Sequence, residues 1–258
     1  MIGLFDSGVG GLSVYRQLKQ RLPHIPVVYV ADTQRAPYGG RAPGELMGFA
    51  TELVDFLLRQ QVSHVVIGCN TVSANAYPQL RERYPQLPLF ELIASAVAES
   101  VATSRLGIGY LATAASVTTG VFKQAVATQA QVPVYDVACP TFVPLVEAGQ
   151  TQGETVRKAV LAYLQPLMDK IDCLVLGCTH YPFLAQTLQA LIKEQGVEIR
   201  LIDPAQVAVR DLQQMLGTTA ISELVADVFY TTGDTSRFDT LAHQLIGKHL
   251  VSRQLTLP

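Results

Sequence analysis

The sequence is short of charge, of any basic excess and of long apolar runs, and each shortage excludes a class of protein. Charged side chains make up only 16% of the 258 residues and apolar ones 49%, which excludes an intrinsically disordered chain. A formal net charge of −2 offers no basic surface to nucleic acid or to an anionic membrane. The most apolar stretch, 89–102, is interrupted by Glu91 and Glu99, so no run approaches the roughly 18 residues that span a bilayer. We therefore expect neither a nucleic-acid partner nor a membrane partner.

Cysteine is also scarce, and its spacing excludes two further uses. Four cysteines in a chain of 258 residues do not form a disulfide framework. There is no Cys-x-x-Cys pair, and Cys178 and His180 lack a third and a fourth ligand, so we expect no metal site. We interpret Cys139 and Cys173 as core residues. The N-terminus shows no basic and then apolar leader, so we expect no signal peptide and a cytoplasmic protein with reduced thiols.

Short apolar strands alternate with helical segments along most of the chain. The expected strands are 1–5, 26–31, 64–68, 89–92, 106–111, 134–137, 173–176, 198–202 and 228–231. The clearest helices are 45–60, 153–170 and 183–195, and most of the tail from Ala208 onward is also predicted to be helical. Strands that alternate with helices are typical of mostly parallel sheets covered on both faces. The sequence therefore predicts an α/β fold, built as one large domain or two small ones.

Two segments far apart in the chain have the same pattern. In 65–71 and in 174–180, an apolar strand ends in Gly-Cys, followed by two polar residues and a predicted helix. Ligand sites in open α/β sheets lie beyond the carboxyl ends of strands, so Cys69 and Cys178 are expected at the mouths of two equivalent units. Two such mouths facing each other would form one closed cleft with a thiol on each side.

Cys69 and Cys178 are the main candidates for chemistry. The ordinary thiol pKa of about 8.5 falls at a helix N-terminus or beside a cation, and both cysteines follow a strand and precede a predicted helix. The alternative is that each cysteine is only a small buried apolar residue. His180 follows Cys178 by two positions, and Glu147 is a lone carboxylate that closes an apolar stretch. A thiol, an imidazole and a carboxylate together are able to shuttle protons.

Two turn-rich segments could add recognition groups. Segment 6–11 follows a strand and opens a helix, a turn that aims backbone N–H groups at an anion. A dinucleotide fingerprint needs glycine where Ser13 stands, which argues against a nicotinamide cofactor. Asp6 suits a base or an amine contact, or it only caps the helix. The loop 32–40 offers Tyr38 for polar recognition, or it is a surface loop without a role.

These segments together resemble the glutamate racemase family, and the likeness extends to about residue 210. Any one of the motifs is unspecific, but five of them in the family's order are highly specific. The matching motifs are Phe5-Asp6-Ser7-Gly8-Val9-Gly10-Gly11, Asp32-Thr33 with Pro37-Tyr38-Gly39, Cys69-Asn70-Thr71, Cys139-Pro140 followed by Leu145-Val146-Glu147, and Leu176-Gly177-Cys178-Thr179-His180-Tyr181-Pro182.

The resemblance implies a fold and an activity. Family members have two pseudo-symmetric α/β lobes with the active site between them. They racemise glutamate without pyridoxal phosphate, another cofactor or a metal, and the D-glutamate feeds bacterial peptidoglycan. For this chain the resemblance implies a first lobe of residues 1–94 plus 208–258, a second lobe of residues 95–207, and a homodimer.

The resemblance also assigns roles to residues. It implies that Cys69 and Cys178 are the acid/base pair, that Asp6 supports Cys69, and that Glu147 and His180 support Cys178. One cysteine would remove the α-proton from one face while the other donates a proton to the opposite face. The residues implied to surround the substrate are Asp6, Ser7, Pro37, Tyr38, Gly39, Asn70, Thr71, Ser116, Thr179 and His180.

The chain departs from the family pattern at several positions. Gly68 precedes the first catalytic cysteine, where the family usually has alanine, and Val72 differs after it. The stretch 91–95 lacks a proline that is usual near the hinge between the lobes. Ser116 stands where a threonine often contacts substrate, and because it keeps the hydroxyl group we expect binding to survive.

Three other functions remain open at this stage. A racemase of aspartate or another small amino acid would share the two-cysteine plan. A non-catalytic amino-acid-binding protein would keep the cleft without the chemistry. A pyridoxal enzyme would need a lysine for its Schiff base, and no lysine lies in one of these motifs.

Overall fold

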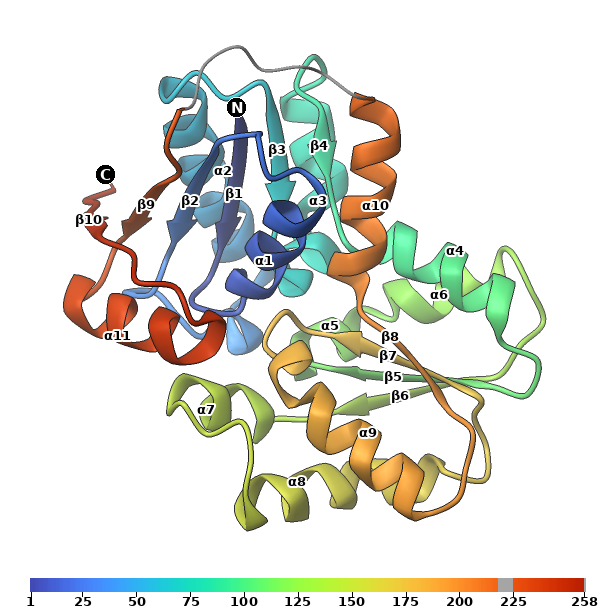
Figure 1. Ribbon diagram of the computed structural model, residues 1–258. Coiled ribbons are helices and arrows are strands. Elements are labelled where there is room, and N and C mark those ends of the chain that lie inside the picture. Colours follow the sequence, from blue (N-terminus) through green and yellow to red (C-terminus); the bar gives the residue numbers. More distant parts are fainter. Residues whose placement is uncertain (218–224, 258) are drawn as a thin grey trace.

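Two parallel sheets form the framework of the computed structural model, which describes residues 1–217 and 225–257 (Figure 1). The larger sheet has six strands in the order β10-β9-β2-β1-β3-β4. The bounds of these strands are β1 Ile2–Asp6, β2 Val27–Ala31, β3 His64–Ile67, β4 Leu89–Phe90, β9 Val228–Thr231 and β10 Ser252–Gln254.

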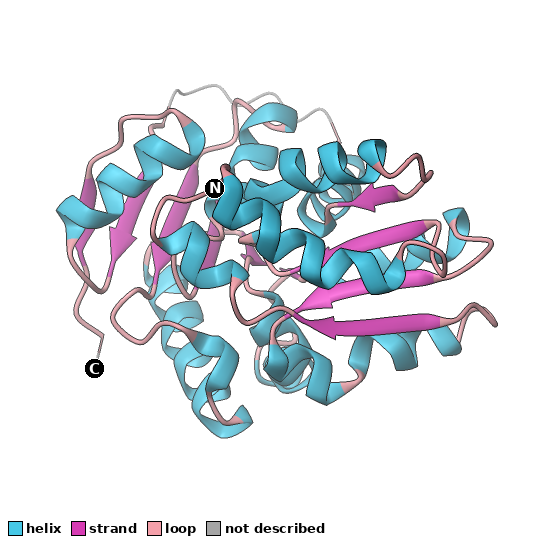
Figure 2. Ribbon diagram, turned by 90° about the horizontal axis from the view of Figure 1, so that it is seen from below, coloured by secondary structure: helices cyan, strands magenta, loops and turns pink. Residues whose placement is uncertain are grey.

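The smaller sheet has four strands in the order β6-β5-β7-β8. Their bounds are β5 Ile108–Ala112, β6 Val134–Ala138, β7 Cys173–Gly177 and β8 Arg200–Ile202. Every pair of neighbouring strands in both sheets is parallel. Seen from below, the strands form two groups with helices alongside each (Figure 2). The predicted α/β fold with parallel sheets is therefore confirmed.

Helices cover both faces of the larger sheet. Leu46, Leu53 and Leu57 of one helix and Leu80 of the next pack with Phe5 of β1 against one face. Alternate strand residues face the other way, toward the helices on the opposite side. The helices of the first face are α2 Pro43–Arg59 and α3 Asn70–Arg83, and those of the opposite face are α1 Leu12–Arg21, α10 Pro204–Leu216 and α11 Thr235–Ile246. Burial on both faces explains the continuous apolar runs of the strands.

The smaller sheet is covered in the same way. Its helices are α4 Ile93–Thr103, α5 Ala114–Thr119, α6 Val121–Ala127, α7 Phe142–Glu147, α8 Glu154–Leu164 and α9 Ala185–Glu194, with short 3₁₀ turns at Tyr38–Gly40, Gln165–Leu167 and Tyr181–Leu184. One apolar cluster includes Leu4 of the larger sheet and Leu174 of the smaller one, so the core is continuous between them. None of the helices within the described ranges has the length and apolar character needed to cross a bilayer.

The C-terminal segment adds to the larger sheet. β9 pairs with β2, and β10 pairs with β9. Helix α11 begins at an N-cap, because Asp234 accepts a hydrogen bond of 2.7 Å from the N–H of Arg237, and it ends at Gly247 in the left-handed conformation. The part of the predicted helical tail that falls on residues 218–224 lies outside the described residues.

Two of the predicted helices differ from the structure at one end. The helix predicted at 153–170 ends at Leu164 and continues only as a 3₁₀ turn, because Pro166 has no N–H to extend the α-helix. The segment after Cys178 is also not yet helical, since the 3₁₀ turn Tyr181–Leu184 precedes α9. The sequence predicts that Cys178 lies at the N-terminus of an α-helix, and this prediction is wrong.

Candidate active site

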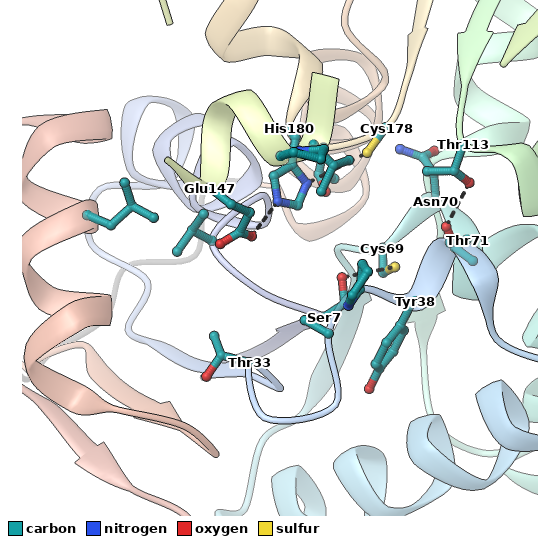
Figure 3. A pocket seen from close by; sticks show the side chains of 18 of the residues that line it. Ser7, Thr33, Tyr38, Cys69, Asn70, Thr71, Thr113, Glu147, Cys178 and His180 are labelled. Carbon is teal, nitrogen blue, oxygen red and sulfur yellow. Dashed lines mark hydrogen bonds and ion pairs between the residues drawn. The ribbon is translucent and has the colours of Figure 1, made fainter. Parts of the chain in front are cut away.

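The carboxyl ends of strands from both sheets line a single cavity of about 530 Å³. β1, β2 and β3 contribute the segments that follow them in the larger sheet, and β5, β6 and β7 do the same in the smaller one. Cys69 and Cys178 both lie on its wall, and Figure 3 shows their sulfur atoms projecting from two different ribbons. The expectation that two strand mouths share one cleft is therefore met by the geometry.

Cys69 lies between β3 and the start of α3 and is only 4% exposed. Its thiol donates to Ser7 Oγ over 3.9 Å, and the N–H of Val72, in the first turn of α3, donates to the sulfur. Burial and then the negative charge of Asp6 raise the pKa of Cys69 well above its ordinary value. The surroundings of Cys69 therefore favour the protonated thiol.

The glycine before Cys69 has a steric reason. A Cβ added at Gly68 would lie 2.9 Å from the backbone oxygen of Phe5 and 2.8 Å from a methyl group of Leu4. The chain thus approaches β1 too closely at this point for an alanine to fit without a backbone shift.

Cys178 follows β7 and is 7% exposed. Its sulfur lies 3.7 Å from Nδ1 of His180, and Nε2 of the same imidazole lies 2.7 Å from Oε1 of Glu147, the last residue of α7. The three groups form a chain of hydrogen bonds from carboxylate to imidazole to thiol, drawn as dashed lines in Figure 3.

The pKa shifts of His180 and Glu147 indicate the charges of these two hydrogen-bonded groups. Burial alone would lower the pKa of His180, but its hydrogen bonds to Cys178 and Glu147 raise that pKa well above the ordinary value. Burial alone would raise the pKa of Glu147, but the hydrogen bond and charge of His180 hold it below the ordinary value. An imidazolium paired with a carboxylate therefore lies beside Cys178.

Asp6 is fully buried behind the cavity wall and does not line the cavity. Its Oδ2 accepts hydrogen bonds from the N–H of Gly11 at 2.5 Å and from Thr179 Oγ1 at 3.5 Å. Its Oδ1 has no partner within the described part of the chain. Burial raises the pKa of Asp6, although the charge of His180 works against this rise. Asp6 can therefore hold or release a proton close to Cys69.

The glycine-rich turn after β1 packs against the segment that carries Thr179 and His180. Ser13 donates to the backbone oxygen of Thr179 over 2.8 Å. A Cβ added at Gly10 would lie 2.4 Å from Nδ1 of His180, so glycine is required for this contact. The turn thus allows the close approach of the two sheets, and its Ser7 lines the cavity.

Most of the residues expected to surround a substrate line the cavity: Ser7, Pro37, Tyr38, Gly39, Asn70, Thr71, Thr179 and His180. Asn70 is 3% exposed, and neither the nitrogen nor the oxygen of its amide has a partner among the residues that the structure describes. A buried amide of this kind is available to bind a polar ligand.

Ser116, like Asp6, is an expected binding residue that does not line the cavity. Its hydroxyl lies 3.0 Å from Oγ1 of Thr113, which does line the cavity and which also lies 3.1 Å from Oγ1 of Thr71. The sequence analysis missed Thr113, although it follows a strand end just as the two cysteines do. Ser116 lies behind it and orients it.

The loop after β2 is held by Asp32. The Asp32 carboxylate accepts hydrogen bonds from Arg35 Nε at 2.6 Å, from Thr232 Oγ1 at 2.8 Å and from the hydroxyl of Tyr38. Asp32 is fully buried, so these hydrogen bonds compensate the cost of burying its charge. It fixes the loop that presents Tyr38 and Gly39, and it ties this loop to the C-terminal segment.

The sequence analysis missed the contribution of the C-terminal segment. Further lining residues are Val9, Thr33, Ala36, Ala114, Cys139, Pro140, Val143, Pro144, Gly233, Asp234, Arg237, Phe238 and Leu241. The last five follow β9 and reach the cavity only because β9 pairs with β2, which no local pattern reveals. Cys139 is a core residue, as expected, and it also lines the cavity.

Comparison with known proteins gives a consistent result. A family profile described as Asp/Glu/Hydantoin racemase matches residues 2–212. The chain is similar to glutamate racemase from Gloeobacter violaceus, with 41% identity over 261 residues that cover 100% of this chain and 97% of the relative.

Two solved structures have the same fold along almost the whole chain. Glutamate racemase from Thermus thermophilus, in complex with beta-chloro-D-alanine, superposes with a TM-score of 0.88 at 32% identity, covering 99% of this chain and 96% of the other. Glutamate racemase from Francisella tularensis, in complex with D-glutamate, superposes with a TM-score of 0.89 at 28% identity, covering 99% and 97%.

Proposed function

We infer that this chain, which belongs to the Asp/Glu/hydantoin racemase family, is a glutamate racemase, an isomerase that interconverts L- and D-glutamate. The substrate is glutamate, as in the Francisella tularensis protein with its bound D-glutamate. Family membership implies a role in supplying D-glutamate for peptidoglycan. The residues that carry out the reaction are our proposal, and the geometry of the cavity supports it.

The difficulty of the reaction lies in the weak acidity of the α-hydrogen. Its removal leaves a carbanion next to a carboxylate that is already negative, so groups that neutralise this carboxylate lower the barrier. The unpartnered amide of Asn70 and the hydroxyls of Ser7, Thr71 and Thr179 line the cavity and can donate to it. We assign to these four residues the binding of the substrate carboxylates, together with the loop of Pro37, Tyr38 and Gly39.

The two thiols transfer the protons. For one enantiomer, the Cys178 thiolate takes the α-proton, and the electron pair of the C–H bond stays on Cα. The thiol of Cys69 then donates its proton to the opposite face, which leaves a Cys69 thiolate and a Cys178 thiol. The other enantiomer reacts in the reverse sense. His180 and Glu147 stabilise the Cys178 thiolate, and Asp6 assists proton exchange at Cys69.

One observation carries this assignment: two buried thiols, from equivalent strand ends of different sheets, line the same cavity. Racemisation requires groups on both faces of Cα, and a single thiol would exchange the proton without efficient inversion. A site of this kind needs no more than the chain's own side chains for the proton transfers.

The experiment is deuterium incorporation at Cα in heavy water, followed by chiral analysis, with protein freed of metals and small molecules. We expect both enantiomers of glutamate to exchange and interconvert, and aspartate to react much more slowly. Tight binding of glutamate without exchange would contradict the proposal in favour of a binding protein. Faster turnover of aspartate would redirect it to another acidic amino acid.

We also propose the domain organisation, the oligomeric state and the cellular location of the protein. We propose lobes of residues 1–94 plus 208–258 and of residues 95–207, a homodimer, and a cytoplasmic location. The location suits a mechanism that depends on free thiols, which a reducing compartment preserves. Light scattering at micromolar concentration tests the dimer, and a monomer under these conditions would contradict it.

A further inference from the structure

Few charged side chains line the cavity, and without one residue of the C-terminal segment their net charge is negative. Glu147 and the imidazolium of His180 form an ion pair and cancel each other. Asp234, at the N-cap of α11, is a second carboxylate on the wall. In the mechanism proposed above, the Cys178 thiolate adds another negative charge. The substrate, with two carboxylates and one ammonium group, is itself an anion.

Among the described residues that line the cavity, Arg237 is the only arginine or lysine. Its backbone is fixed in the first turn of α11 by the hydrogen bond of its N–H to Asp234. Its guanidinium makes no hydrogen bond and no ion pair with any residue in 1–217 or 225–257, and the residue is exposed. The charge is nevertheless close enough to act on Glu147, whose pKa it helps to lower.

The position of α11 explains what such a free cation can do. Figure 3 shows the red ribbon of the C-terminal segment on the far side of Glu147 from the two labelled cysteines. Arg237 is exposed, whereas Cys69 and Cys178 are only 4% and 7% exposed, so its charge lies nearer the solvent-facing mouth of the cavity than the thiols do. A charge at the mouth of a cleft changes how often an ion enters and how long it stays, but not the proton transfer itself.

We propose that Arg237 attracts the anionic amino acid into the cavity and so favours a substrate with a second carboxylate over neutral amino acids. The inference rests on the proposed function, because it takes glutamate as the ligand and the Cys178 thiolate as part of the field. Arg237 compensates the repulsion between the substrate and the negative groups of the wall. It is a specificity-determining residue that acts on binding.

The test compares Arg237→Gln with Arg237→Lys and with a matched control. Arg59→Gln makes the same change of net charge at an exposed residue. Arg59 ends α2 shortly before β3 begins, so it lies near the amino ends of the strands, whereas the cavity lies at their carboxyl ends. At low ionic strength we expect Arg237→Gln to lower kcat/KM for both enantiomers roughly fivefold, through KM, with kcat retained. Arg237→Lys should keep most of the activity, and Arg59→Gln should match the unmodified protein.

Salt and a second variant sharpen the test. At about 0.5 M salt the difference between Arg237→Gln and the unmodified protein should shrink, because screening shortens the reach of the charge. Asp234→Asn keeps an N-cap residue and removes the opposing charge, so it should raise kcat/KM at low salt. An unchanged KM in Arg237→Gln, or a fall in kcat alone, would overturn the inference while leaving the racemase intact. Absence of racemisation by the unmodified protein would instead overturn the proposed function.

Discussion

The surroundings of Cys69 and Cys178 have the same backbone origin but opposite electrostatics. Each cysteine follows the carboxyl end of a central parallel strand, β3 in one sheet and β7 in the other. Beside Cys69 lies the buried carboxyl of Asp6, whereas beside Cys178 lies the imidazolium of His180. A repeated sequence motif therefore does not produce two equivalent acid/base groups. The two thiols have different surroundings, with an anionic group beside one and a cationic group beside the other.

The two halves are also coupled across the cleft. Thr179 of the second half donates to Asp6 of the first, and the N–H of Val9 in the first half donates to Glu147 of the second. Each supporting carboxylate thus has a hydrogen bond from the opposite half. The positions of both carboxylates therefore depend on how closely the two sheets approach.

The largest effect is expected from Cys69→Ser and Cys178→Ser. Either change removes the acid/base group on one face of Cα, so racemisation should fall by about 10³-fold or more. The remaining thiol should still exchange the α-proton of one enantiomer, and a different one in each variant. Turnover in both directions and Cα deuterium exchange measure this. If either variant keeps near-normal turnover in both directions, the two-thiol assignment is wrong.

A smaller effect should separate the supporting groups. Asp6→Asn should slow the direction in which Cys69 acts as the base, and His180→Gln the direction in which Cys178 does, each by about 10²-fold. The reason is that each group stabilises the charge change of its own thiol. Initial rates of deuterium release from each α-deuterated enantiomer report the two directions separately. Equal slowing of both by the same variant would show that the two halves do not act separately.

Glu147→Gln should destabilise the protein in a pH-dependent way. The pKa of Glu147 is lowered from 4.5, so its contribution is fully present above pH 4.5 and is lost as pH falls through the lowered value. The pKa of His180 is raised from 6.5, so its contribution is fully present below pH 6.5 and is lost as pH rises through the raised value.

The loss in unfolding free energy should therefore be greatest between pH 4.5 and pH 6.5, where both contributions are fully present. There it should reach about 2 kcal/mol, the value of a charge-assisted hydrogen bond. Urea unfolding at a series of pH values measures it. The surface change Glu154→Gln, at an exposed ion pair, is the control and should show almost no loss. A loss that does not vary with pH would contradict the ion pair.

The smallest effect is expected from Tyr38→Phe, which acts on the Cys69 half alone. It removes the hydrogen bond to Asp32 and keeps the ring, so the free energy of unfolding should fall by about 1 kcal/mol. The loop that presents Gly39 should loosen, and KM should rise a few-fold while kcat stays near normal. Denaturant titration and steady-state kinetics test both statements. A large fall in kcat would instead give Tyr38 a part in the proton transfers.

Much of the fold was predictable from local pattern. Strands such as 173–176 and 228–231 are found within a residue or two, because short apolar β-branched runs between turns are typical of buried strands in an α/β fold. The short helices α5 and α6 were not predicted, since their sequences carry little periodicity and their capping depends on context. The helix predicted to extend to residue 170 ends at Leu164, because Pro166 cannot continue the α-helical hydrogen bonds.

The site residues also divide into those that local sequence predicts and those that only tertiary packing brings to the cavity. The cysteines, Asn70 and Thr179 were identifiable because polar residues that follow an apolar strand fall at the carboxyl edge of a sheet. Asp234 and Arg237 were not, because their place depends on a strand pairing more than 190 residues apart in the chain, that of β9 with β2. Ser116 is predicted to contact the substrate, but Thr113 lines the cavity in its place, since sequence does not tell which of two neighbouring hydroxyls faces the cavity.

By itself the sequence determined the α/β alternation, the two Gly-Cys strand ends and the groups near them, because each depends on residues adjacent in the chain. Only the tertiary structure shows that the two ends face one cavity and how close Asp6 lies to Cys69 and His180 to Cys178. It also decided that a cation of the C-terminal segment faces the same space. Charges act through distance in space, and only the packing of the sheets sets those distances.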